Sequence, residues 1–154
     1  MSGSALAPVQ ATFRAVAETV VPEMASLTPD AWREVEAVVE AALASRPEAM
    51  RRQLVAFLRI IELLPLLRRF RRFSHLTPQQ RTAVLHGLES SRHLLVRRGF
   101  WGVRTLVFMG YYTREDVQGA LGYRAHADGW SARRTTGEMR AVATEPFDEE
   151  SRDP

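Results

Sequence analysis

The chain of 154 residues has the length of one domain, and its 45% hydrophobic and 25% charged residues are the balance of an ordinary globular protein. It contains no cysteine, which excludes disulfides, thiolate catalysis and cysteine-bound metals. All 21 basic residues are arginine, a bias typical of GC-rich bacterial genomes, and the lack of lysine excludes a Schiff-base or P-loop lysine.

The net charge of +3 hides an uneven distribution along the chain. Residues 1–45 carry two arginines against six acids, and residues 145–154 carry one arginine against five acids. Residues 46–104 carry thirteen arginines against three glutamates, a net charge of +10. The chain is therefore acidic at both ends and basic in the middle.

The N-terminal residues show no charged leader and no twin arginine. The most apolar stretches, 60–67 and 100–112, are interrupted by charged residues and are shorter than the ~20 residues of a membrane span. We therefore expect no membrane span and a cytoplasmic location, with the periplasm reached only if a partner carries the chain there.

Two helices are predicted near the N-terminus. Apolar residues recur at helical spacing from Val9 to Val21, and Pro22 is expected to end this first helix. The second should begin at Thr28-Pro29-Asp30, which combines an N-cap hydroxyl, a proline at the first helical position and an acid in the first turn.

Two capping boxes are predicted further along the chain. Ser45 and Glu48 have the required spacing and should open a third helix. Thr77 and Gln80 repeat the pattern ahead of another helical run. A longer helix is then expected over about residues 91–109.

A short last helix is predicted to begin at Thr113 and to end near Gly119 or Gly122. No segment shows the alternation of a strand. The sequence therefore predicts an all-α fold, a single-domain helical bundle of about six helices over residues 9–123. Residues 124–154 lack periodicity and are expected to form an extended or partly disordered tail.

The segment 68–73, Arg-Arg-Phe-Arg-Arg-Phe, is the strongest charge motif. Such a segment suits nucleic acid, anionic lipid or an acidic protein. An apolar residue at every third position favours instead a buried stripe with the arginines on its flanks. The members of this stripe are Leu64, Leu67, Phe70, Phe73 and Leu76.

Candidate catalytic and metal-binding groups are sparse. His86, Glu89 and His93 are spaced to share one helical face and could supply metal ligands, but no facing helix offers a matching set. Adjacent acids such as Glu115-Asp116 point to different sides of a helix and make no acid–base pair. We therefore predict no catalytic, metal-binding or cofactor-binding residue in this chain.

Two glycine-aromatic corners, Gly110-Tyr111-Tyr112 and Leu121-Gly122-Tyr123, bracket a short polar segment. Large aromatic side chains and arginines are enriched at protein interfaces, although at tight corners they can also hold helices together. The residues predicted to contact a partner are Phe100, Trp101, Tyr111, Tyr112, Tyr123 and Trp130, with Arg68, Arg69, Arg71 and Arg72.

The order of these motifs resembles a known family. Phe13-x-x-Val16 and Thr19-Val20-Val21-Pro22 come first, and Phe100–Met109 then leads into the two glycine-aromatic corners. Over about residues 11–130 the chain resembles the gluconate 2-dehydrogenase subunit 3 family. The resemblance implies a cofactor-free small subunit that binds and stabilises an FAD-dependent sugar or alcohol dehydrogenase of the glucose-methanol-choline type.

On this interpretation the partner is the large FAD-binding subunit of a hetero-oligomer, the FAD lies in that partner, and no nucleic acid is involved. Two alternatives stay open at this point. The +10 segment would suit a basic helical nucleic-acid-binding protein, whose binding should weaken steeply with salt. The face carrying His86, Glu89 and His93 would suit a stand-alone metal enzyme.

Overall fold

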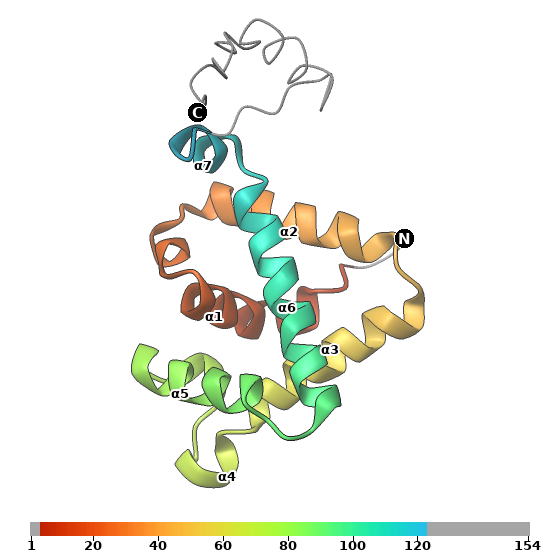
Figure 1. The fold of residues 1–154 in the computed structure, drawn as a ribbon, viewed down its shortest axis with the longest axis vertical. Coiled ribbons are helices and arrows are strands. Elements are labelled where there is room, and N and C mark those ends of the chain that lie inside the picture. Colours follow the sequence, from red (N-terminus) through yellow and green to blue (C-terminus); the bar gives the residue numbers. More distant parts are fainter. Residues whose placement is uncertain (1–3, 123–154) are drawn as a thin grey trace, which may run out of the picture. The chain divides into compact units, whose positions relative to one another are not determined.

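The computed structural model describes residues 4–122, apart from the side chain of Arg69. These residues contain helices and no strand, so the predicted all-α fold is confirmed for them (Figure 1). No helix among them is long and apolar enough to cross a bilayer. The predicted tail, with Tyr123 and Trp130, lies outside the described residues. The elements in chain order are η1 (Ala7–Val9), α1 (Gln10–Val20), η2 (Pro22–Ser26), α2 (Pro29–Ala44), α3 (Glu48–Leu63), α4 (Leu66–Arg69), η3 (Phe73–His75), α5 (Pro78–Glu89), α6 (Leu94–Tyr112) and α7 (Glu115–Ala120), the η elements being 3-10 turns.

Two of the predicted helix starts are confirmed. The Thr28 hydroxyl accepts a hydrogen bond from the Ala31 N–H at 3.2 Å, and α2 begins at the following proline. At α5 the capping box is complete, because Thr77 accepts from the Gln80 N–H and the Gln80 side chain accepts from the Thr77 N–H. Both caps satisfy N–H groups that a helix leaves unpaired at its start.

The predicted capping box at Ser45 is wrong. The Ser45 hydroxyl donates to the Ala42 carbonyl at 2.8 Å and so belongs to the last turn of α2. Pro47 occupies the N-cap of α3, and its carbonyl accepts from the N–H groups of the first turn. The helix predicted over 91–109 also begins and ends three residues later, because residues 91–93 form the link from α5.

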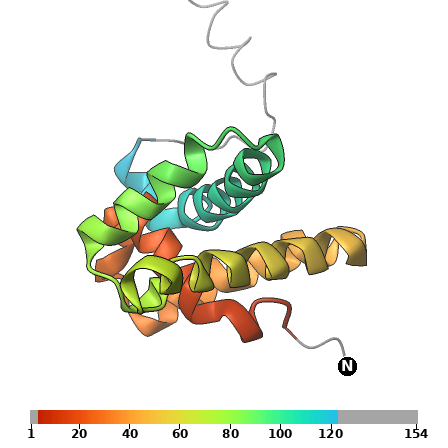
Figure 2. The same ribbon diagram turned by 90° about the horizontal axis from the view of Figure 1, so that it is seen from below.

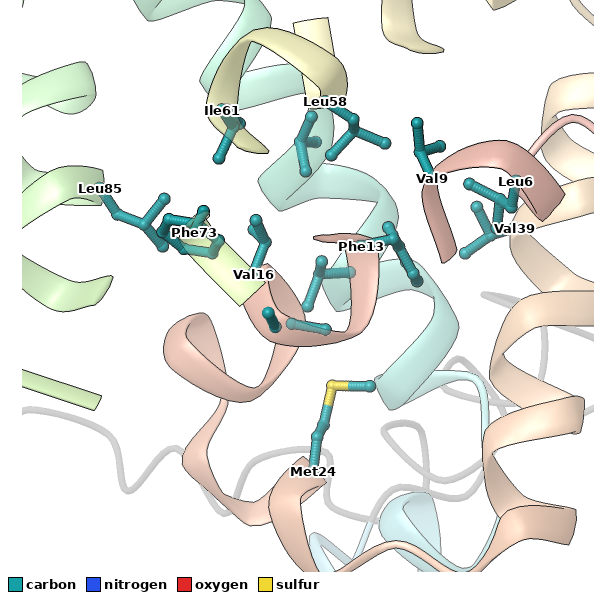
Figure 3. Close-up of a cluster of buried hydrophobic side chains, with 14 of the residues drawn as sticks. Leu6, Val9, Phe13, Val16, Met24, Val39, Leu58, Ile61, Phe73 and Leu85 are labelled. Carbon is teal, nitrogen blue, oxygen red and sulfur yellow. The ribbon is translucent and has the colours of Figure 1, made fainter. Parts of the chain in front are cut away.

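α1 lies in the core, where Phe13, Val16 and Ala17 are fully buried. It packs against α3, α5 and α6 and against the turns η2 and η3. Figure 3 shows Phe13 and Val16 among core side chains that include Ile61 of α3 and Phe73 of η3. α6 crosses the body lengthwise and makes its largest contact with α2 (Figure 1).

Two glycines of α6 allow neighbouring helices to come close. A β-carbon at Gly110 would lie 2.8 Å from Val35 Cγ1 and 3.2 Å from the Val35 carbonyl oxygen of α2. One at Gly99 would lie 2.8 Å from the Phe57 ring of α3. Gly110 was expected at a corner, but it is a buried interior residue of α6, and the helix continues to Tyr112.

We predict that Gly110→Ala destabilises the protein while Gly102→Ala stabilises it. The added methyl group at 110 meets a β-branched side chain and a backbone oxygen, and such overpacking, which can reach about 3 kcal/mol, outweighs the roughly 1 kcal/mol that alanine gains from helix propensity. At 102 a β-carbon meets nothing within 4 Å, so alanine should raise the free energy of unfolding by roughly 1 kcal/mol through helix propensity. Urea unfolding measures both, and a Gly110→Ala protein as stable as the parent would contradict the packing.

Candidate interaction surfaces

Large apolar side chains are exposed mainly at one end of the described structure. Seven of the eleven such residues come from the C-terminal half of α3, the α4 region and the start of α6. Leu67, Phe70 and Leu95 are the most exposed, at 82%, 89% and 81%. Leu64 and Leu67 line one common groove, and contiguous apolar exposure of this kind is typical of binding surfaces. The seven residues are Ile60, Leu63, Leu64, Leu67, Phe70, Leu94 and Leu95.

The predicted buried stripe over residues 64–76 is therefore wrong in its first part. Phe73 and Leu76 are buried as predicted, but Leu64, Leu67 and Phe70 are exposed. α4 ends at Arg69, and Phe70 adopts the left-handed conformation with φ 53°. The chain leaves the helix at this residue, so a three-residue spacing does not remain on one face.

A hydrogen-bonded corner holds α4 in place. The Glu62 carboxylate accepts from the Ser74 N–H at 3.1 Å, from the Ser74 hydroxyl at 2.6 Å and from the Thr12 hydroxyl at 3.0 Å. Arg81 of α5 donates to the Ser74 carbonyl at 2.6 Å and pairs with Glu18 of α1 at 3.1 Å. These bonds tie α1, α3, η3 and α5 together around the base of the segment that carries α4.

An open groove of about 520 Å³ lies between the α3–α4 corner and α5. Figure 2 shows α4 and α5 on the side of the structure that faces the viewer. Most of the lining is apolar, and a β-carbon at Gly87 would meet nothing within 4 Å, so space is open above α5. We call this feature the arginine groove; it is lined by Leu64, Pro65, Leu67, Arg68, Ala83, Val84, Gly87 and Leu88.

The surroundings of the arginine groove are positively charged. Arg68 lines it, and Arg71 and Arg72 line a neighbouring hollow beyond α4. All three are exposed, and none forms an ion pair within residues 4–122. The two acids nearest in sequence are engaged, since Glu62 holds the corner and Glu89 pairs with Arg104 at 3.0 Å.

A second surface lies at the junction of α6 and α7. The Tyr112 ring, 46% exposed, lies edge-on to Tyr111 at 5.2 Å and 5.9 Å from Phe108. Desolvation by burial, helped by Glu23, raises the pKa of Tyr111, which is half-buried against the core. We call this the aromatic surface; its hollow of about 350 Å³ is lined by Glu23, Tyr111, Tyr112, Asp116, Val117, Ala120 and Leu121.

The predicted contact residues do not form one interface. α4 and α7 lie at opposite ends of the structure (Figure 1), so the arginines and the tyrosines are far apart. Trp101 is 63% exposed on α6, whereas Phe100 is buried in the core and is not available to a partner. Tyr123, Trp130 and the side chain of Arg69 lie outside what the structure describes.

The sequence interpretation missed the α5 wall of the groove and the exposed residues Leu63 and Leu95. One signal was available for Leu95: it follows Leu94 directly, and neither falls on the buried stripe of α6 at Phe100, Val103 and Val107. The open space at Gly87 could not be predicted from the sequence, because it depends on the packing of α5 beside the α3–α4 corner.

The predicted face of His86, Glu89 and His93 does not form. α5 ends at Glu89, and His93 is the N-cap of α6, so the three residues do not share one helix. Among the described residues no three histidine, aspartate or glutamate side chains gather in a way that could hold a metal ion.

Comparison of the chain with protein-family models, with curated proteins and with solved structures finds no match. The resemblance to the gluconate 2-dehydrogenase subunit 3 family therefore stays a prediction. The arginine groove and the aromatic surface are the candidate binding surfaces of the described residues.

We predict that Glu62→Ala lowers the free energy of unfolding by about 1–3 kcal/mol. The variant loses three hydrogen bonds to a carboxylate and leaves the buried Thr12 hydroxyl without its acceptor. Glu89→Ala is the control, because it removes an exposed pair worth less than about 1 kcal/mol. Equal effects of the two substitutions in urea unfolding would contradict a special role of the Glu62 corner.

Proposed function

We propose that this chain is a non-catalytic, protein-binding accessory subunit whose partner is an FAD-dependent dehydrogenase of the glucose-methanol-choline type. The observation that carries the protein-binding role is the exposure of Leu64, Leu67 and Phe70 around α4, beside arginines that form no ion pair among the described residues. The kind of partner comes from the family resemblance alone. A cytoplasmic complex, with FAD bound in the partner, is part of the same proposal.

The exposed apolar side chains of and beside α4 favour contact with a protein partner over contact with water. Leu67 and Phe70 are almost fully exposed although the core accommodates Phe73 only three residues later. Removing such side chains from water is favourable, and arginine with aromatic residues is enriched where proteins meet. A partner that covers this end would gain that free energy on binding.

The mechanism that we propose is stabilisation by mass action. A partner that binds only the folded subunit raises the subunit's stability, and the subunit stabilises the partner's bound conformation in the same way. No reaction step is assigned to the chain. Its effect on the dehydrogenase would be seen as yield, thermal stability and retention of FAD.

The test is co-expression of the tagged chain with a candidate FAD-dependent dehydrogenase from the same genome. We expect the two to co-purify with flavin absorbance in the eluate. Replacing Leu67 and Phe70 together by serine should reduce the recovered partner about tenfold or more. Met50→Ser, which changes an exposed apolar residue near the start of α3, is the matched control and should leave recovery unchanged.

Failure of any flavin-containing chain to co-purify would count against the proposed partner. If the serine double variant still recovered the partner while Tyr112→Ala lost it, the aromatic surface would be the interface. In that case the chain would still be an accessory subunit, but the residues around α4 would not contact the partner.

One observation favours a second candidate, nucleic-acid binding. Arg68, Arg71 and Arg72 are exposed and without ion pairs among the described residues. If these arginines neutralise phosphates, the logarithm of the affinity should fall linearly with the logarithm of salt concentration. Titration with duplex DNA and with single-stranded RNA decides this, and no binding at low salt would exclude it.

A further inference from the structure

We propose that the arginine groove binds an acidic, amphipathic helix of a partner protein. This inference rests on the proposed accessory function in one respect, since it names the partner segment which that function requires. The groove itself, however, can be tested with a defined peptide and without any dehydrogenase.

The shape of the groove suits a helix. Its walls come from two separate elements, with Leu64 and Leu67 on the α3–α4 side and Val84 and Leu88 on α5. Such a concave, mainly apolar site takes the apolar face of an amphipathic helix, whose anchors recur every three or four residues. Phe70, at the end of α4 and 89% exposed, is available as a further apolar contact.

Small residues of α5 leave room for the incoming backbone. Ala83 and Gly87 line the groove one helical turn apart, and nothing lies within 4 Å of a β-carbon built on Gly87. The glycines at 99 and 110 differ, because Phe57 and Val35 of the same chain already fill their space. Packing within the described chain therefore gives no reason for glycine at 87, although glycine weakens a helix.

The charge around the groove selects an acidic occupant. Arg68 is part of the lining, Arg71 and Arg72 follow it closely, and the local acids Glu62 and Glu89 are already bonded within the chain. Carboxylates on the flanks of an incoming helix would meet guanidinium groups that form no ion pair within residues 4–122, whereas lysines would be repelled. The apolar contact would supply the affinity, and the pairing of arginines with carboxylates would fix the direction in which the helix lies in the groove.

The corner at Glu62 and Ser74 makes both walls available before binding. It fixes the base of the α4 segment to α3, and Arg81 fixes α5 to the same Ser74. Little ordering is then required when the occupant arrives, which favours affinity.

The experiment titrates the purified full chain into a fluorescein-labelled helical peptide of about 16 residues, with leucines on one face and glutamates elsewhere. One comparison peptide has lysine in place of glutamate. The other has the same composition in an order that separates the leucines. We expect saturable binding of the acidic amphipathic peptide and at least about tenfold weaker binding of both comparison peptides.

The matched variants are Gly87→Trp and Gly102→Trp. Both positions are helical, and a β-carbon at either meets nothing within 4 Å, so both variants should keep the parent's circular dichroism and melt at a temperature no lower than the parent's. Only position 87 lies in the groove. Tryptophan at 87 should weaken peptide binding about tenfold or more, tryptophan at 102 should not, and Arg68→Glu should shift preference toward the lysine peptide.

The proposal is overturned if the acidic peptide does not bind saturably, if the scrambled peptide binds equally well, or if Gly87→Trp has no effect. Binding to phosphatidylglycerol vesicles with no peptide binding would assign the surface to a membrane instead. Self-association that Gly87→Trp abolishes would assign it to a second copy. Peptide binding only after deletion of the acidic residues 145–154 would make that segment the occupant.

These outcomes are separate from those of the proposed function. Peptide binding without a co-purifying flavoprotein would retain the groove and remove the dehydrogenase as partner. A flavoprotein complex that Gly87→Trp leaves intact, together with a failed titration, would retain the accessory role and remove the groove.

Discussion

The hydrogen bonds that converge on Glu62 and Ser74 decide what this protein can present to a partner. The carboxylate fastens the chain after α4 back onto α3, and Arg81 fastens α5 to the same point. Phe73 is drawn into the core beside this corner, while Leu67 and Phe70 stay outside it. The half-buried Glu62 carboxylate thus helps to keep Leu67 and Phe70 exposed, although the hydrophobic effect alone would favour their burial.

α6 packs against the three helices whose residues form this corner. Its contact with α2 at Gly110 brings backbone and side chain close enough that even a methyl group would not fit. The same helix also packs against α1, α3 and α5, so one long element holds the helices that bear the arginine groove. The aromatic surface lies at its far end, where Tyr111 packs against the core while Tyr112 and Leu121 are exposed. Leu67 and Phe70 beside the groove are more exposed than Tyr112, and this difference favours the groove over the tyrosines as the binding site.

Local rules predicted the helices well, and the surface poorly, for physical reasons. The caps at Thr28 and Thr77 depend on groups within four residues, which a sequence displays. At Ser45 the same rule failed because the hydroxyl could serve the helix before it as well as the one after. The exposure of Phe70 beside the buried Phe73 could not be predicted, since the chain leaves α4 through the left-handed backbone at Phe70 and is held by a bond between residues twelve positions apart. The family resemblance added a partner class that neither the fold nor the comparisons test.

On the proposed function, a partner covers the groove between α4 and α5. Hydrogen exchange of backbone amides, compared between the free chain and the purified complex, tests it most directly, because exchange slows where a partner excludes water and suppresses local opening. We predict slower exchange in residues 63–72 and 83–90 and unchanged exchange in α2 and α7. Protection confined to residues 111–121, with residues 63–72 unaffected, would contradict it.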